Sequence, residues 1–392
     1  MPPGTTPAPY RLDGLELASG IVIGSGTDLE PPEVPLAPTV RAAVEAVLLE
    51  ALQRPPLVVL FSGGRDSSAL LSTATALARA HSLPLPLPAT MLFKADDRAA
   101  EGEWAERMVR YLGLQDWERH TVTDELDVVG PFARRVLGQF GPVYPVNAHL
   151  FLPFAPITQG GTMVTGLGGD ELFSLRSWWS FARDLRAGRR MDIVRVLAGI
   201  PPRPIRRLVY PVAEPRLPWL DGPAQREVRR RLARVHAAAP RRWADMILTT
   251  WWKELDRAAI ERTMRAVMAC HDVDIVHPFT APGVLAAAAK VHPRSGFPSR
   301  TEGMREVFGD ILPDEVLSRS SKARFNGALF ATFSRQFVHR WQGEGSEGLP
   351  IDRAALQRTW ATEPVDARSL PLLQGLWCRS TGTGPAPAVS AA

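Results

Sequence analysis

The sequence predicts an α/β fold in which a doubly wound parallel sheet is followed by a mainly helical C-terminal part. Short apolar runs at 57–61, 90–93 and 162–166 have the length and composition of buried parallel strands. Segments with helical spacing stand between these runs, and such alternation is typical of doubly wound sheets. After about residue 178 the strand signals fade, and periodic Arg, Ala and Leu patterns continue to about residue 360. Because these sheets bind ligands at the carboxyl ends of their strands, we expect the functional site there.

Composition narrows the class of protein. The 392 residues are 45% hydrophobic and 22% charged, which is typical of globular proteins and allows two or three domains. No run of eighteen apolar residues occurs, and the start MPPGTTPAPYRLDG lacks the pattern of a signal peptide, so no membrane association is expected. Cys270 and Cys378 are too few for a disulfide framework and do not have the spacing of zinc ligands. We therefore expect a cytoplasmic protein.

Changes in composition divide the chain into four parts. Residues 1–38 are rich in Pro and Gly, with one strand-like stretch at 15–23. Residues 39–180 carry the alternating pattern of the α/β core, and residues 181–364 carry the mainly helical pattern. Residues 365–392 form a C-terminal segment that ends in a tail expected to be disordered.

The core begins with a predicted helix at 39–53, which Pro55 and Pro56 end. The strand at 57–61 follows, and it stops at the first motif, Ser62-Gly63-Gly64-Arg65-Asp66-Ser67-Ser68. An Ala- and Leu-rich helical pattern then continues to about Ala80. This order of strand, glycine-rich turn and helix is the usual arrangement of a phosphate site.

The residue types of the first motif suit a phosphate that carries a metal ion. Its glycines let the backbone approach an anion, the N–H groups of the helix start point at the anion, and three seryl hydroxyls add donors. Asp66 would repel a bare phosphate, so it fits better as a ligand of Mg²⁺ bound to that phosphate. The motif is not a Walker loop, because GxxxxGK[ST] occurs nowhere in the chain. A strand–turn–helix corner without a ligand is the alternative.

The chain between the two motifs continues the alternation. The strand at 90–93 precedes a helical pattern at 94–113, which Gly113 can close, and another helix is predicted at 125–140. The helix at 94–113 is recognised from apolar residues at helical spacing, which are Trp104, Met108, Tyr111 and Leu112. The strand at 162–166 leads into the second motif.

The second motif reads Gly166-Leu167-Gly168-Gly169-Asp170-Glu171-Leu172-Phe173 and follows its strand directly. It is another glycine-rich turn, and it ends in paired carboxylates. Alone it is a weak signal, but it stands about 100 residues after the first motif, and the pair together is a strong one. The alternative for Asp170 is a purely structural helix N-cap.

The pair of motifs resembles the synthetase domain of asparagine synthetase and of its relatives, the β-lactam synthetases and lasso-peptide cyclases. These are PP-loop ATP pyrophosphatases with an adenine nucleotide alpha hydrolase-like fold, and their SGGxDS motif holds the β,γ-pyrophosphate of ATP. The resemblance implies ATP and Mg²⁺ as cofactors, with Asp66 and Asp170 as the metal ligands. The residues that it places against the nucleotide are Ser62, Gly63, Gly64, Asp66, Ser67, Ser68, Phe93, Gly166, Leu167 and Gly168.

Two further segments extend the resemblance over roughly residues 39–335. The stretch 318–327, SRSSKARFNG, is similar to the family segment with a catalytic lysine, which would be Lys322. A solvent-exposed lysine is the alternative, but only four of the 46 Lys and Arg residues are lysines, so this chain rarely uses Lys for charge. The stretch 272–279, DVDIVHPF, is a weaker match to the family pattern GVExRxPF.

The departures from the family concern the nitrogen donor and the acceptor. Full-length members carry a glutaminase domain whose cysteine follows the initiator Met, whereas this chain has Pro2, so we expect no glutaminase and interpret residues 1–38 as a candidate stub of a lost domain. Leu167 stands where asparagine synthetases have Glu and β-lactam synthetases have Tyr. Val276 and Ala281 replace a family Arg and Asp. The ATP chemistry is thus retained while the acceptor side is rebuilt, and aspartate is in doubt as the substrate.

The predicted function is an ATP-dependent amide-forming synthetase. It would adenylate a substrate carboxylate with release of pyrophosphate and then transfer the acyl group to an amine. Its partners would be a small-molecule or peptide carboxylate, an amine donor and, as an open alternative, a separate partner protein. The rebuilt acceptor side suggests specialised-metabolite or modified-peptide biosynthesis, with intramolecular cyclisation as one form. His277, within the 272–279 segment, could help deprotonate the amine, although a structural role is the simpler interpretation.

Two other functions stay open. A PP-loop tRNA-modifying enzyme would also adenylate and would suit the net charge of +5 and the pI near 9.6, but the second motif argues against it. A non-catalytic subunit of another synthetase would not need an intact first motif or Lys322. The densest basic cluster, at 226–234, is most simply a solvated helix face, and a docking face for an acidic peptide or RNA is the alternative.

Overall fold

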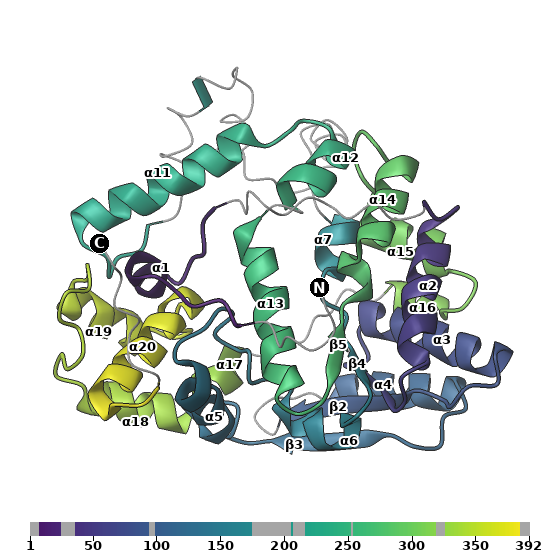
Figure 1. The fold of residues 1–392 in the computed structure, drawn as a ribbon, viewed down its shortest axis with the longest axis horizontal. Coiled ribbons are helices and arrows are strands. Elements are labelled where there is room, and N and C mark those ends of the chain that lie inside the picture. The colour runs from purple at the N-terminus through teal and green to yellow at the C-terminus, as the bar shows by residue number, and fades with distance from the viewer. Residues whose placement is uncertain are drawn as a thin grey trace.

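The computed structural model describes residues 8–24, 36–93, 99–174, 205–206, 216–251, 254–318 and 326–384. It confirms the predicted α/β class with a five-stranded sheet whose order is β3-β2-β1-β4-β5, all neighbours being parallel (Figure 1). The strands are β1 (Leu57–Leu60), β2 (Leu87–Phe93), β3 (Glu118–Val122), β4 (Thr162–Val164) and β5 (Asp274–Val276).

The strand order reverses at β1, so the switch point of the sheet lies between β1 and β4. From β1 the chain continues to β2 and β3 on one side, and β4 and β5 then fill the other side. Leu57 pairs with Thr162 and Val59 with Val164, so the two strands end within one residue of each other. Doubly wound sheets bind their ligands at this crevice.

Helices cover both faces of the sheet, as the alternation along β1 requires. Leu57 and Val59 point into one apolar cluster with α2 (Val40–Leu52), α3 (Arg65–Ala80), α4 (Ala99–Tyr111) and α14 (Pro282–Val291). Val58 points to the opposite face, into a cluster with α5 (Pro131–Phe140), α6 (Ala155–Thr158) and α13 (Leu255–Ala269).

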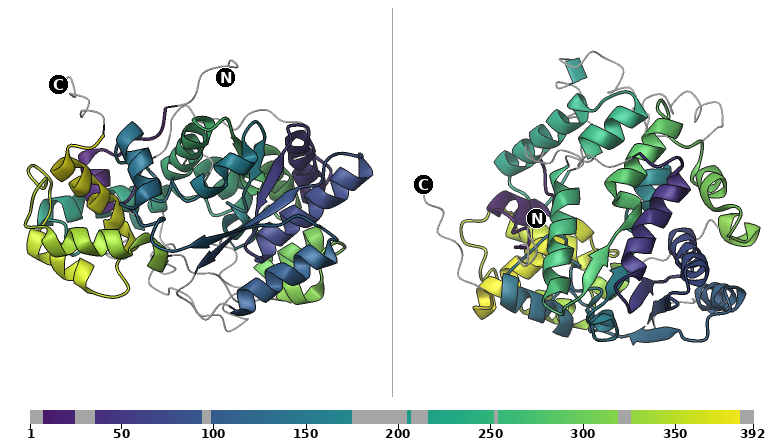
Figure 2. Two further views of the ribbon diagram at one scale, coloured as in Figure 1. Left: turned by 90° about the horizontal axis from the view of Figure 1, so that it is seen from below. Right: turned by 45° about the vertical axis from the view of Figure 1, so that its right-hand side comes forward.

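The described residues after 216 are mainly helical, as the sequence predicts. A third apolar cluster lies away from the sheet, and in both views of Figure 2 its yellow C-terminal helices stand at the far end from α2 and α3. The remaining elements of the described chain are α1 (Gly14–Ser19), η1 (Leu152–Phe154), α7 (Gly169–Ser174), α11 (Gly222–Ala238), α12 (Trp243–Asp245), η2 (Met246–Trp251), η3 (Pro278–Thr280), α15 (Arg300–Phe308), α16 (Asp314–Ser318), α17 (Asn326–Leu329), α18 (Thr332–Arg340), α19 (Arg353–Ala361), η4 (Ala367–Ser369) and α20 (Leu370–Thr381).

One element prediction is wrong and several boundaries differ. The stretch 15–23 is not a strand, because Asp13 and Glu16 form a capping box that starts helix α1, with the Glu16 N–H donating to Asp13 at 2.6 Å. The helix expected at 125–140 begins only at Pro131. β3 and β5 were not predicted, since β3 is a largely exposed edge strand and β5 has only three residues.

Two surface expectations can be compared with the described residues. None of the described helices combines the length and the apolar character that a membrane span needs.

On α11, Arg226, Arg230 and Arg234 are exposed at four-residue spacing while Val228 is buried, which confirms a solvated basic face. Glu227 accepts from Arg230 at 2.8 Å and so offsets part of this charge; docking of an acidic partner there stays a prediction.

Candidate active site

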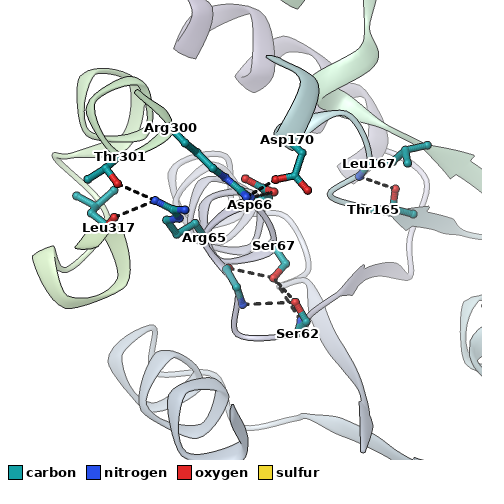
Figure 3. A network of polar contacts seen from close by, with 11 residues as sticks. Ser62, Arg65, Asp66, Ser67, Thr165, Leu167, Asp170, Arg300, Thr301 and Leu317 are labelled. Atoms are coloured by element: carbon teal, nitrogen blue, oxygen red, sulfur yellow. Dashed lines mark hydrogen bonds and ion pairs between the residues drawn. The ribbon is translucent and has the colours of Figure 1, made fainter. Parts of the chain in front are cut away.

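The first motif forms a closed turn between β1 and α3 (Figure 3). Gly63 has φ +69°, and a Cβ there would lie 3.0 Å from the backbone N of Ala105 in α4, so this position requires glycine. The Ser67 hydroxyl donates to the Gly64 carbonyl at 3.2 Å and accepts from the Ser62 N–H at 3.3 Å. These bonds set the turn before any ligand arrives, which would lower the ordering cost if an anion binds there.

The surroundings of this turn hold it at the end of the sheet. The Thr90 hydroxyl donates to the Phe61 carbonyl at 2.5 Å and accepts from the Trp117 indole at 2.9 Å, which ties the end of β1 to β2. Phe93 is the last residue of β2 and is partly buried. Ser68 is fully buried, and its hydroxyl has no hydrogen-bond partner in the part of the chain that the structure describes. Contact of Phe93 and Ser68 with a nucleotide stays a prediction.

The second motif lies directly against the first through its glycines. A Cβ at Gly169 would come within 2.5 Å of the Asp66 carboxyl carbon, and one at Gly166 would lie 3.2 Å from the Asp66 Cβ. Gly168 has φ +89° and passes close to Thr280. A side chain is therefore excluded most strongly at Gly168 and Gly169 and is tightly limited at Gly166, and these glycines let Asp66 and Asp170 converge from neighbouring strand ends.

Leu167 and His277 lie at the second motif and at the strand end beside it. Leu167 is 39% exposed, and its backbone N–H donates to the Thr165 hydroxyl at 3.2 Å. The Thr165 hydroxyl is 2.6 Å from His277 Nδ1, so the imidazole helps to hold the turn. Burial lowers the pKa of His277 to about 4, which favours the structural interpretation over a base that acts at neutral pH.

Asp66 and Asp170 share one cation, the guanidinium of Arg300 (Figure 3). One terminal nitrogen of Arg300 donates to Asp66 Oδ2 and the other to Asp170 Oδ1. Burial raises the pKa of Asp66, and the charge of Arg300 opposes that effect. Asp170 is the second residue of α7, so it is not the N-cap of that helix.

Sequence reasoning missed Arg300. The pattern Ser299-Arg300-Thr301-Glu302 is a helix-start signal, and the Ser299 hydroxyl does accept from the Glu302 N–H at 3.1 Å. Nothing in the sequence distinguishes Arg300 from the many other arginines, however. Its position depends on Gly303, where a Cβ would lie 2.9 Å from Phe173, because this glycine lets α15 pack on α7.

Lys322 lies outside the described residues, which stop at 318 and resume at 326. The chain before this gap contacts the first motif, since Arg65 donates to the Thr301 hydroxyl at 2.8 Å and to the Leu317 carbonyl at 3.4 Å. The chain after the gap is tied to buried Asp127, which accepts from the Ala331 N–H at 2.8 Å. Both flanks of the segment are thus attached to the α/β core.

The residues at the centre of the site fit a magnesium ion that also has phosphate ligands. The two carboxylates converge, and Asp66 Oδ1 is a buried oxygen without a hydrogen-bond partner among the described residues. No group of three or more His, Cys, Asp or Glu side chains suited to a metal occurs in those residues. Because Mg²⁺ prefers six oxygen ligands, this pair would supply a minority of them and leave the rest to phosphate and water.

A parallel α/β sheet with two glycine-rich turns at its switch point defines a nucleotide-binding domain of the adenine nucleotide alpha hydrolase type. The chain belongs to the asparagine synthase family, whose family model matches residues 39–371. A search of curated proteins finds no match. Membership implies ATP-dependent adenylation and C–N ligation, with ATP and Mg²⁺ as general requirements of the family and a carboxylate and an amine as substrates.

Burial of His277 leads to a prediction about how the stability of the fold depends on pH. A histidine with a folded pKa near 4 and an ordinary unfolded pKa near 6.5 destabilises the fold as the pH falls through that window. The full effect is about 3 kcal/mol at low pH. We expect His277→Gln to lose less unfolding free energy than wild type between pH 7 and pH 4.5, measured by urea unfolding.

Glu254 affects the pH dependence of stability in the opposite direction to His277. The effect of His277 therefore has to be isolated with a single variant, His277→Gln. Burial, with Asp256 and Glu171 as further causes, raises the pKa of Glu254 to about 7, so its stabilising protonation is lost as the pH rises through 7. The free energy of unfolding of the wild-type protein, measured against pH, contains both effects. His339→Gln, which changes an exposed histidine, is the control, and equal pH losses in wild type and His277→Gln would contradict the assignment.

Proposed function

We propose that this protein is an ATP-dependent synthetase that joins a carboxylate to an amine through an acyl-adenylate. The observation that carries the proposal is the convergence of both motifs on Asp66 and Asp170 at the switch point of the sheet. In the first step a carboxylate oxygen attacks the α-phosphorus of ATP, and the bond to pyrophosphate breaks. In the second step an amine attacks the acyl carbon, AMP leaves and the amine loses a proton.

The first motif would hold the leaving pyrophosphate. Its turn is closed by the Ser62 and Ser67 contacts, and it opens α3, whose N-terminal N–H groups favour an anion. We assign Asp66 and Asp170 to Mg²⁺, which when bound neutralises charge on the phosphates. We assign Lys322 to the charge that develops around the α-phosphate in both steps. Attachment of its flanks to Arg65 and Asp127 supports this assignment.

The acceptor side would differ from that of an asparagine synthetase. Leu167 presents an exposed apolar side chain at the second motif, Val276 ends β5, and Ala281 precedes α14. None of the three can hold an amino-acid substrate by charge. We therefore propose a substrate less polar than aspartate, such as an intermediate of specialised metabolism or a modified peptide. The amine would then be a free donor or a second group on the same substrate.

The products of ATP cleavage test this function. We expect the protein, given Mg²⁺, ATP, a panel of amino acids and short peptides, and hydroxylamine as a small amine, to form hydroxamate with equal amounts of AMP and pyrophosphate. If the phosphate site binds the β- and γ-phosphates, only the α-phosphorus is accessible to attack by the carboxylate. Chromatography of the nucleotides makes the measurement, and ADP with orthophosphate as the main products would refute the proposal.

A further inference from the structure

We propose that Arg300 competes with the metal ion for the Asp66–Asp170 pair, so that the pair accepts a divalent cation only when the guanidinium leaves. The inference rests on the proposed function, because it takes this pair as the metal site. It adds an internal counter-ion that exchanges with the metal and couples metal entry to nucleotide entry.

The geometry makes the two cations mutually exclusive. Arg300 places one terminal nitrogen on each carboxylate, on Asp66 Oδ2 and on Asp170 Oδ1, so it stands between the two groups (Figure 3). A magnesium ion bound by both carboxylates needs oxygens about 2.1 Å away, which leaves no space for a nitrogen between them. The side chains of Arg300 and Asp66 are only 19% and 15% exposed, so weak screening makes this pair stronger than one at the surface, whereas Asp170 is 37% exposed.

Arg300 is attached in a way that permits exchange. Among the described residues the hydrogen bonds and ion pairs of its guanidinium go to these two carboxylates, and its buried Nε has no hydrogen-bond partner. The neighbouring Arg65 also interacts electrostatically with both carboxylates, but its side-chain hydrogen bonds go to the Thr301 hydroxyl and the Leu317 carbonyl. One arginine at the site is therefore anchored by neutral groups, while the other is held only by the groups that a metal would take.

Competition lowers the affinity for a metal ion that arrives alone. If Arg300 occupies the pair for 90 to 99% of the time, the apparent dissociation constant rises about 10- to 100-fold. A nucleotide changes the balance, because its phosphates bring further ligands for the metal and a new acceptor for the guanidinium. The metal and the nucleotide are then expected to bind together, and binding of the metal without a nucleotide is suppressed.

The test measures Mn²⁺ binding without nucleotide, using the electron paramagnetic resonance signal of free Mn²⁺. We expect Arg300→Ala and the longer apolar Arg300→Met to gain one site at least about tenfold tighter than wild type. Arg305→Ala is the matched control, because Arg305 lies on the same helix and pairs only with exposed Asp314 at 3.4 Å among the described residues. The gained site should disappear when Asp66→Asn is added to Arg300→Ala.

Each outcome decides the proposal. A new Mn²⁺ site that depends on Asp66 supports it. Unchanged or weaker binding in both Arg300 variants overturns it, as does a gained site that survives Asp66→Asn. A wild-type protein that already binds one Mn²⁺ tightly without nucleotide also overturns it, even if the variants do not fold. Failure of the proposed function would instead appear in wild type as a lack of adenylation, which this experiment does not measure.

Discussion

Asp66→Asn and Asp170→Asn are each expected to reduce the rate of adenylation about 10³-fold, which corresponds to several kcal/mol of charge stabilisation by a bound metal. Asparagine keeps the size of the side chain but removes the negative charge that a divalent cation needs. The two carboxylates come from different motifs and converge at one point, so loss of either one leaves an incomplete ligand pair. Steady-state formation of AMP with saturating Mg²⁺ and ATP makes the measurement.

Exposed Asp310 provides the control for these two variants. It contacts Arg41 at 3.4 Å on the surface, and Asp310→Asn should behave like wild type. Circular dichroism should show that all three variants fold. If both motif variants keep more than half of the wild-type rate, the assignment of the metal ligands is wrong.

Lys322→Ala is expected to lower turnover by roughly 10²–10³-fold, or about 3–4 kcal/mol, while the dissociation constant for ATP changes little. Negative charge gathers around the α-phosphate in the transition states of both steps, and a lysine is a compact charge that can stay close to it. In the proposed mechanism ATP itself would be bound chiefly by the first motif and the metal. Lys322→Arg should also be slow, because the guanidinium is larger and its charge is spread over a plane.

Lys290 in the last turn of α14 is the control for this prediction, since it is an exposed lysine outside every motif. Lys290→Ala should have the turnover of wild type. Single-turnover kinetics and equilibrium titration with ATP separate the chemical step from binding. A folded Lys322→Ala protein that keeps more than half of the wild-type rate would remove Lys322 from the catalytic site.

The fold could be predicted where local signals and tertiary structure agree. Apolar runs bounded by glycine-rich turns located β1 and β4, and Thr39 and Pro55 marked the two ends of α2. The prediction failed where a short element depends on distant partners. β5 has three residues and exists because it pairs with β4, about 110 residues earlier in the chain. At 15–23 the capping box of Asp13 starts a helix that ends at Ser19, and the β-branched residues Ile21, Val22 and Ile23 follow it in irregular chain.

The candidate site was predictable in its motifs and not in its electrostatics. The spacing of SGGRDSS and GLGGDELF points to two carboxylates at neighbouring strand ends, and the structure brings Asp66 and Asp170 together. Arg300 could not be found, because its role follows from the packing of α15 on α7 rather than from any local pattern. The same holds for Asp127, whose buried carboxylate accepts from Ala331 about 200 residues later.

The fate of one oxygen atom tests the central claim most directly. A carboxylate that forms a hydroxamate in the assay with amino acids and short peptides is labelled with ¹⁸O in both carboxylate oxygens. It is then incubated with the protein, Mg²⁺, ATP and hydroxylamine. Attack of the carboxylate on the α-phosphorus predicts AMP that carries one ¹⁸O per turnover, with none in pyrophosphate, as measured by mass spectrometry. Label in orthophosphate together with ADP would show attack on the γ-phosphorus and would contradict the adenylation mechanism.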